Sequence, residues 1–228
     1  MDLRTRILEA AADLLSRSAE ADFSTRAVCE AAGVGAPALY RQFGDKEGLL
    51  AAVVDHGFEA YLAGKRAAKP SGDPVRDLRE GWDNHVAFAL DHPNYYRVMY
   101  AGLSTPPGAA AEAHGLLLAV LERCAAAGRL KLPPSLAAQM VMAANAGVAL
   151  SMITRPARYP DPGFSARVRE SVLAGILAEE PAKPDDAVAA TATTLGAMLR
   201  KTAPAELSAA EATLLQEWLA RLTLHNGR

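Results

Sequence analysis

Residues 23–50 read FSTRAVCEAAGVGAPALYRQFGDKEGLL, and this stretch decides the fold. Ser24 and Thr25 are candidates to cap a short first helix. Gly33 stands where the C-terminal end of that helix needs a residue able to adopt a positive φ. The pattern therefore predicts a short helix that ends in a sharp glycine turn.

A second short helix follows the turn. Pro37 falls in its first turn, where the missing N–H costs nothing. Leu39 and Phe43 are four residues apart and would be buried on one face. Gly44 and Asp45 end this helix, and Asp45 can cap the next one. Two short helices around a glycine turn predict a helix-turn-helix, whose second helix enters the DNA major groove.

The stretch resembles the DNA-binding segment of the tetracycline-repressor (TetR) family of bacterial regulators. The resemblance covers about a fifth of the chain. The matching pieces are Thr25-Arg26, Ala32-Gly33-Val34, Leu39-Tyr40-Arg41-Gln42-Phe43 and Asp45-Lys46-Glu47-Gly48-Leu49-Leu50. Two positions depart from the family pattern: Gly35 replaces the usual serine or threonine cap, and Ala36 stands where lysine is frequent. The resemblance implies a DNA-binding regulator with phosphate contacts from Thr25, Tyr40 and Lys46.

Seven side chains are the candidates for DNA contact. They are Thr25, Ala36, Pro37, Tyr40, Arg41, Gln42 and Lys46. Ala36 and Pro37 offer apolar contact with a thymine methyl. Arg41 can donate to a phosphate or to guanine, and Gln42, which replaces the family's usual histidine, to a phosphate or to adenine. Residues 1–50 hold six basic and eight acidic side chains, so affinity must come from the placement of a few charges.

Composition predicts an all-α fold with two parts. Half of the 228 residues are apolar, only 6% are aromatic, and no stretch alternates apolar and polar residues as a strand would. We expect a DNA-binding domain over residues 1–47 and a larger helical domain for ligand binding and dimerisation over residues 48–228. The net charge of −2 argues against polyanion binding by bulk charge. Two distant cysteines, Cys29 and Cys124, and the lack of a secretory signal favour a cytoplasmic protein.

One uncharged segment, residues 135–154, is nearly long enough to span a membrane. It contains Gln139 and Asn145 and many alanines, which weaken its transfer into lipid. We therefore predict a helix packed within a soluble protein, with no membrane partner. Ala143, Gly147 and Ser151 are small and four residues apart, which suits a domain core or a subunit interface.

The rest of the chain also predicts helices. They cover about residues 3–17, 45–68, 73–92, 95–103, 109–127, 164–179 and 185–201, and a last helix begins after Ser208. Ser208 and Glu211 form a capping-box pattern at that start. In this last helix an apolar stripe is expected to be buried: Leu214, Leu215, Trp218, Leu219 and Leu222.

The larger part holds soft and polar side chains inside apolar helices, as small-molecule sites do. The candidate ligand-binding residues are Trp82, His85, Tyr96, Met99, Met142 and Asn145. Each of them could instead fill the core. Asn145 is the most informative, because a buried amide needs a partner from the protein, water or a ligand.

Enzymatic motifs are missing from the sequence. There is no phosphate loop, dinucleotide turn or nucleophile elbow, and the histidines are scattered, so no catalytic residue, metal or cofactor is expected. We expect a ligand-responsive repressor that binds a near-palindromic operator as a homodimer and is released by a mostly apolar small molecule. The alternative is a small-molecule-binding or sequestering protein with a vestigial helix-turn-helix.

Overall fold

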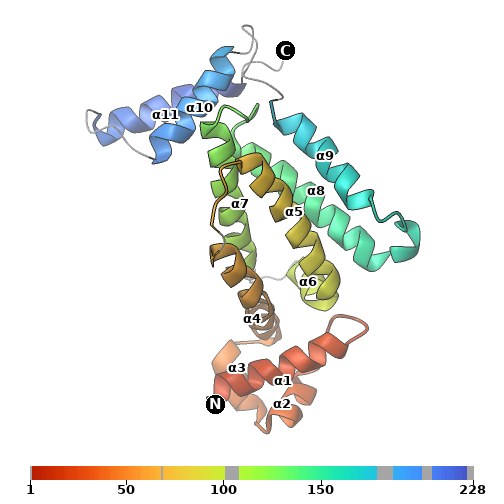
Figure 1. Cartoon of the computed structure of the whole chain (residues 1–228). Coiled ribbons are helices and arrows are strands. Elements are labelled where there is room, and N and C mark those ends of the chain that lie inside the picture. Colours follow the sequence, from red (N-terminus) through yellow and green to blue (C-terminus); the bar gives the residue numbers. More distant parts are fainter. Residues whose placement is uncertain (1, 68, 101–107, 179–186, 202–206, 225–228) are drawn as a thin grey trace. The chain divides into compact units, whose positions relative to one another are not determined.

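A computed structural model describes residues 2–67, 69–100, 108–178, 187–201 and 207–224 (Figure 1). Over these residues the secondary structure is helical apart from one isolated antiparallel bridge between Leu130 and Leu177. This confirms the all-α class, with an N-terminal helix-turn-helix unit followed by a larger helical part.

The helices follow one another with short connections. They are α1 (Leu3–Arg17), α2 (Thr25–Ala32), α3 (Ala36–Phe43), α4 (Lys46–Ala67), α5 (Pro74–Asp91), α6 (Pro93–Met99), α7 (Gly108–Ala126), α8 (Pro134–Thr154), a 3-10 turn (Pro156–Arg158), α9 (Phe164–Ile176), α10 (Ala187–Lys201) and α11 (Ala209–Leu224). Residues 101–103, which were expected to continue α6, lie outside the described residues.

The chain forms two compact units that interleave in sequence. The first unit comprises Met1–Ala68, Val86–Ala113 and Ala149–Arg158, and the second comprises Lys69–His85, His114–Val148 and Tyr159–Arg228. The domain boundary expected between residues 47 and 48 stays a prediction.

The first unit contains the helix-turn-helix. Helix α1 packs against α2 and α4, and α3 packs against α2 and α4 (Figure 1). Ile7 and Leu15 of α1, Val28 of α2 and Leu39 of α3 are fully buried between these helices. Because these positions recur at helical spacing, each short helix shows one apolar side to the others and its polar side to solvent.

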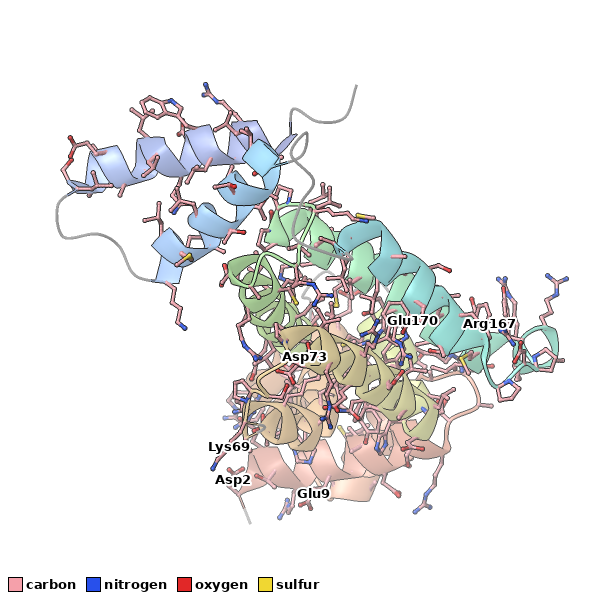
Figure 2. The ribbon with its side chains drawn as sticks, turned by 45° about the horizontal axis from the view of Figure 1, so that its top comes forward. Asp2, Glu9, Lys69, Asp73, Arg167 and Glu170 are labelled. Carbon is pink, nitrogen blue, oxygen red and sulfur yellow. The ribbon has the colours of Figure 1, made fainter. Side chains whose placement is uncertain are left out.

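In the second unit, oppositely charged side chains pair between helices α5 and α9. Arg79 of α5 and Glu170 of α9, the latter labelled in Figure 2, pair at 3.0 Å. Helix α9 ends at Ile176, earlier than expected, because the next backbone groups leave the helix to pair with residues 129–131. The Lys131 N–H donates to the Ile176 carbonyl at 2.8 Å, and the Ala178 N–H donates to the Arg129 carbonyl at 3.1 Å.

The prediction for the last helix is correct in its start and wrong in its burial. The Ser208 N–H donates to Glu211 Oε2 at 2.9 Å, so the capping box forms. Leu219 is buried, but Leu214, Trp218 and Leu222 are exposed by 43%, 52% and 46%. Helix α11 lies beside α10 (Figure 1), which covers only part of the wide apolar stripe of α11.

Helix α8 is, by length and composition, the one described helix that could cross a membrane. Its most apolar window has a mean hydropathy of 1.6, and 39% of that window is buried inside the structure. Soluble core helices pass the same test, and the burial of Ala137, Val141 and Asn145 shows one side packed on protein. Ala143 and Gly147 lie on the exposed side.

Candidate DNA-binding interface and effector site

The turn between α2 and α3 is fixed by local hydrogen bonds. Ser24 Oγ accepts from the Ala27 N–H at 3.1 Å and caps α2. Gly33 has φ 63°, a left-handed conformation that costs glycine least, as expected. The Val34 N–H then donates to the Cys29 carbonyl at 3.0 Å. The chain is therefore turned sharply before α3 begins.

Helix α3 buries one side and exposes the other. Leu39 is fully buried and Phe43 is 9% exposed. All five side chains expected to contact DNA from this helix are exposed: Ala36, Pro37, Tyr40, Arg41 and Gln42. Gly35 caps the helix without a side-chain hydrogen bond. Pro37 has no N–H and the Ala38 N–H donates to the Gly35 carbonyl at 3.0 Å, so the first turn of α3 needs no side-chain cap at these two positions.

Two predicted phosphate contacts come from different helices and meet in the structure. Thr25 Oγ1 and the Tyr40 hydroxyl are 3.4 Å apart. Their hydroxyls are neutral donors, so both can bond one phosphate oxygen without a charge having to be desolvated. The structure therefore brings Thr25 and Tyr40 together as one polar patch.

Lys46, the third predicted phosphate contact, is engaged by a residue that sequence reasoning missed. Its Nζ lies 2.7 Å from Asp22 Oδ2. Partial burial acts to raise the pKa of Asp22, but the hydrogen bonds from Lys46 and from the Phe23 N–H outweigh it and hold this pKa below its ordinary value. Asp22 is consequently ionised at neutral pH and competes with phosphate for Lys46. The separation of 24 residues gave no local signal for this pair.

Arg4 is a second basic residue that the sequence did not single out. Its Nη1 donates to the Gln42 carbonyl at 3.0 Å, and its guanidinium lies 4.5 Å from the centre of the Phe43 ring. Arg4 thus joins the start of α1 to the end of α3, the recognition helix, and helps to orient α3.

The junction between α3 and α4 depends on a close approach at Gly48. A Cβ at this position would lie 2.2 Å from the Phe43 carbonyl oxygen. Asp45 Oδ1 accepts from the Gly48 N–H at 2.7 Å and caps α4, as expected. Because Gly48 lets the two helices meet closely, α4 continues directly from the DNA-binding unit.

Four of the six candidate ligand residues belong to the second unit. Trp82 donates from Nε1 to Ser165 Oγ at 3.0 Å, and Asn145 Nδ2 donates to the Trp82 carbonyl at 3.3 Å. Asn145 is 4% exposed, and its Oδ1 has no hydrogen-bond partner among the described residues. His85 is buried nearby in sequence on α5, and Met142 is half-buried on α8. A buried acceptor without a donor is costly, so Asn145 marks a place where a donor is wanted.

The other two candidates, Tyr96 and Met99, lie on α6 in the first unit. Tyr96 is fully buried and Met99 is 8% exposed. The six candidates are therefore divided between the two units, and their assembly into one pocket stays a prediction.

Helix α6 also holds the end of α1, which the sequence did not suggest. Asn94 Nδ2 donates to the Leu15 and Ser18 carbonyls at 2.9 and 2.8 Å, and to the Ser16 carbonyl at 3.2 Å. Arg97 Nη1 donates to the Ala19 carbonyl at 3.1 Å. These bonds are made to carbonyls of the last turn of α1 and of the residues that follow it, where few backbone donors remain. They join α6 to the scaffold of the helix-turn-helix.

No group of three or more histidine, cysteine or acidic side chains that could hold a metal ion occurs among the described residues.

Comparison with known proteins agrees with this geometry. Residues 7–53 match the family of bacterial regulatory proteins described as "tetR family". No curated protein matches the chain in sequence.

Several solved structures share the fold. The transcriptional regulator FadR from Bacillus subtilis, in complex with stearoyl-CoA, has a TM-score of 0.62 and 17% identity over 75% of this chain and 98% of its own. A TetR variant from Acinetobacter baumannii AYE, in complex with minocycline, has a TM-score of 0.58 and 22% identity over 77% and 96%. A possible TetR family transcriptional regulator from Streptomyces coelicolor A3(2) has a TM-score of 0.55 and 23% identity over 96% of both chains.

The chain has the fold of a transcription regulator, with an N-terminal helix-turn-helix followed by a larger helical part. Residues 7–53 carry the DNA-binding domain described for the tetR family of bacterial regulatory proteins, and the described helices share the fold of solved regulators of that family. Regulators of this family bind DNA and small-molecule ligands and act as dimers.

Proposed function

We propose that this protein is a cytoplasmic, ligand-responsive repressor that binds a near-palindromic operator as a homodimer and is released by a mostly apolar small molecule. The observation that carries this proposal is the exposed side of α3, which presents Tyr40, Arg41 and Gln42, with the Tyr40 hydroxyl 3.4 Å from Thr25 Oγ1. Phosphate donors next to side chains able to bond base edges are what reading a major groove requires.

Dimerisation follows from the small size of the recognition helix. Helix α3 has eight residues and can reach only a few base pairs. A two-fold dimer repeats the contact in a second major groove and roughly doubles the binding free energy.

We place the dimer contact on the apolar face of α10 and α11. This face exposes Val188, Leu195, Met198, Leu214, Trp218 and Leu222. It is hollowed by a groove of about 310 Å³, whose lining includes Val188 and Leu195 of α10 and Leu222 of α11. Because exposed apolar side chains and an apolar groove occur on one surface, this surface can pack against the same surface of a second copy in a two-fold dimer.

The competing contact is the exposed side of α8, where Leu136 and Met140 are exposed by 36% and 39%. Sedimentation of Leu195→Glu and Met140→Glu separates the two. We expect the first change to give monomers and the second to leave the dimer intact, and the reverse result would move the dimer contact to α8.

Ligand binding is supported by the unpartnered Oδ1 of buried Asn145 and by the burial of Trp82, whose carbonyl accepts from Asn145 Nδ2. A small molecule with an N–H or O–H donor would satisfy that oxygen. Asn145→Leu should therefore keep the fold and weaken a donor-bearing effector. If the effector binds Asn145→Leu with the same affinity as wild type, Asn145 is not part of the effector site.

The signal is proposed to travel through α4 and α6. Helix α4 runs without a break from Lys46 to Ala67, so it joins the DNA-binding unit directly to the rest of the chain. Helix α6 holds the end of α1 through Asn94. A ligand that binds better to another position of these helices would change the spacing of the two recognition helices in the dimer. The free energy by which it shifts this equilibrium cannot exceed the difference between its binding free energies for the two states. Inserted Gly-Ser residues near Gly64 should keep ligand binding and abolish induction.

The decisive comparison with the sequestering alternative is a double variant. That alternative is favoured by the engagement of Lys46 by Asp22 and by Ala36 at the start of α3. Tyr40→Ala with Lys46→Ala removes two phosphate contacts from the exposed side of the unit. A repressor loses retention of genomic DNA fragments while its melting temperature is kept, and Lys69→Ala serves as the control. If wild type and the double variant retain the same DNA, the helix-turn-helix is vestigial.

A further inference from the structure

A lysine and three tyrosines gather between α4 and α6 within the first unit. The Lys65 Nζ lies 4.8 Å from the centre of the Tyr61 ring, one helical turn earlier on α4. On α6 and its end, the rings of Tyr96 and Tyr100 are 5.0 Å apart, and their hydroxyls are hydrogen-bonded to each other. Tyr100 also lies close enough to raise the pKa of Tyr61, after the larger effect of burial. We name Tyr61, Lys65, Tyr96 and Tyr100 the Lys65 cluster.

The Lys65 ammonium has no carboxylate partner among the described residues. The next residue, Arg66, is paired instead, with Glu59 of α4 at 2.7 Å and with Glu112 of α7 at 3.1 Å. Asp55 accepts from the Ala109 N–H at 2.8 Å. Burial lowers the pKa of Lys65 to about 8, so the ammonium keeps its proton at neutral pH. Its charge is thus partly removed from water and lies over the Tyr61 ring, which compensates for part of the lost hydration.

Aromatic rings of α4 and α5 pack together beside the cluster. The ring centres of Phe58 and Phe88 are 4.4 Å apart, and those of Tyr61 and Phe88 are 4.6 Å apart. Burial raises the pKa values of Tyr61, Tyr96 and Tyr100, so all three phenols remain protonated at neutral pH, with the hydroxyls of Tyr96 and Tyr100 engaged with each other. A cation beside aromatic rings suits a ligand that is anionic at one end and apolar along its length.

We propose that Lys65, beside the aromatic rings of its cluster, binds the anionic head, a carboxylate or a phosphate, of an otherwise apolar ligand. This inference rests on the proposed function in taking that ligand as the effector, and it names the effector's chemical class. An anion at Lys65 would restore the electrostatic stabilisation that the ammonium loses on burial.

The position of the cluster links such a ligand to DNA binding. Tyr96 and Tyr100 belong to α6 and its C-terminal end, and Asn94 on the same short helix donates to the Leu15 and Ser18 carbonyls at the end of α1. A head group bound at Lys65 beside these rings therefore acts on the helix that holds the DNA-binding unit.

The test compares ligands that differ only in the head. Dodecanoate, dodecyl phosphate and dodecanol are titrated by calorimetry, below micelle-forming concentrations, into the full-length protein. We expect at least one of the two anions to bind about tenfold or more tightly than the alcohol, since a charge-assisted hydrogen bond contributes about 1.5–3 kcal/mol. Which of the two binds better distinguishes a carboxylate head from a phosphate head.

Three variants assign that preference to Lys65. Lys65→Met should abolish the preference for an anionic head over the alcohol, while its affinity for dodecanol stays within about twofold of wild type. Lys65→Arg should retain most of this preference. Lys69→Met, a change at an exposed lysine, is the control and should leave the preference unchanged. Lys65→Met is expected to fold, because it replaces a desolvated ammonium by an apolar side chain of similar length. If wild type does not prefer either anion, or if Lys65→Met keeps the preference, the proposal is overturned.

Failure of this inference and failure of the proposed function give different results. A chain that selects no operator but prefers an anion through Lys65 is an anion-binding protein and not a repressor. A chain that selects an operator but shows no Lys65-dependent preference is a repressor whose ligand binds in another way.

Discussion

Replacing Asp22 by asparagine should tighten DNA binding, because it releases Lys46. The two side chains pair at 2.7 Å, and they are exposed by 50% and 43%, so the pair contributes only about 0.2–1 kcal/mol. Phosphate must displace Asp22 before it can bind Lys46, and the substitution removes that cost. Asparagine Oδ1 can still accept from the Phe23 N–H, which donates to Asp22 Oδ1 at 2.7 Å, so the local fold should be kept.

The expected gain is about 1.4-fold to 5-fold per half-site, from the free energy of the pair alone. Where Asp22 neutralises Lys46 in the wild type, its removal also steepens the dependence of log K on log salt, by up to about 0.9 per half-site. The assay is fluorescence anisotropy of a labelled duplex at several salt concentrations. Glu20→Gln, in the same connection between α1 and α2, makes the same change of net charge and is the matched control.

The result that would refute this reasoning is specific. If Asp22→Asn and Glu20→Gln change the affinity and the salt slope equally, only the overall charge matters and Lys46 makes no phosphate contact. If Asp22→Asn in a Lys46→Ala background still tightens binding, the gain does not come from Lys46.

Three further predictions concern the scaffold. Gly48→Ala should lower the free energy of unfolding, measured in urea, by at least about 2 kcal/mol, because the new Cβ would lie 2.2 Å from the Phe43 carbonyl oxygen. Gly64→Ala is the control: its Cβ would meet nothing within 4 Å, so it should raise the free energy of unfolding by about 0.4–1 kcal/mol. Equal effects of the two changes would contradict the close approach at Gly48. Asn94→Ala should speed amide hydrogen exchange at the end of α1 by about tenfold, since three carbonyls lose a donor, and unchanged exchange would show that α6 does not hold α1. Lys65 has a folded pKa of about 8 against 10.5 in the unfolded chain, so folding at neutral pH is penalised by its charge, and the penalty fades as pH rises from about 8 to 10.5. Lys65→Met should therefore be more stable than wild type at pH 7 by about 1–3 kcal/mol, with the gap closing over that range, and a gap independent of pH would contradict it.

The local structure of the DNA-binding unit could be predicted because its signals lie within a few residues of one another. Gly33 was expected at the left-handed end of α2, and it has φ 63°. Leu39 and Phe43, four residues apart, are both buried, which leaves the predicted contact side chains on the opposite side of α3. The helix expected to start at Asp45 begins at Lys46 with Asp45 as its cap.

What could not be predicted depends on partners distant in sequence. The apolar stripe of α11 gave no means of telling a domain core from a surface left for a second copy, so Trp218 was expected to be buried and is 52% exposed. The pairing of Lys46 with Asp22 and the donation from Asn94 to α1 join segments 24 and about 80 residues apart. Periodicity along one helix carries no information about such contacts.

The candidate effector site could be predicted only in part from the sequence, for the same reason. Asn145 was correctly expected to be a buried amide in need of a partner, and its Oδ1 has none within the described part of the chain. Lys65 was overlooked because a lysine near the end of a helix is ordinarily a solvated residue. Its burial beside Tyr61 is visible only in three dimensions.

Selection from random duplex DNA tests the central claim most directly. The purified protein, refolded without ligand, is used at moderate salt, and the bound sequences are read after several rounds. We predict an inverted repeat whose half-site centres are a whole number of helical turns apart, because two copies of α3 must enter successive major grooves on one side of the duplex. Sequence-blind binding, or none, from the refolded protein would contradict the assignment of this chain as an operator-binding regulator.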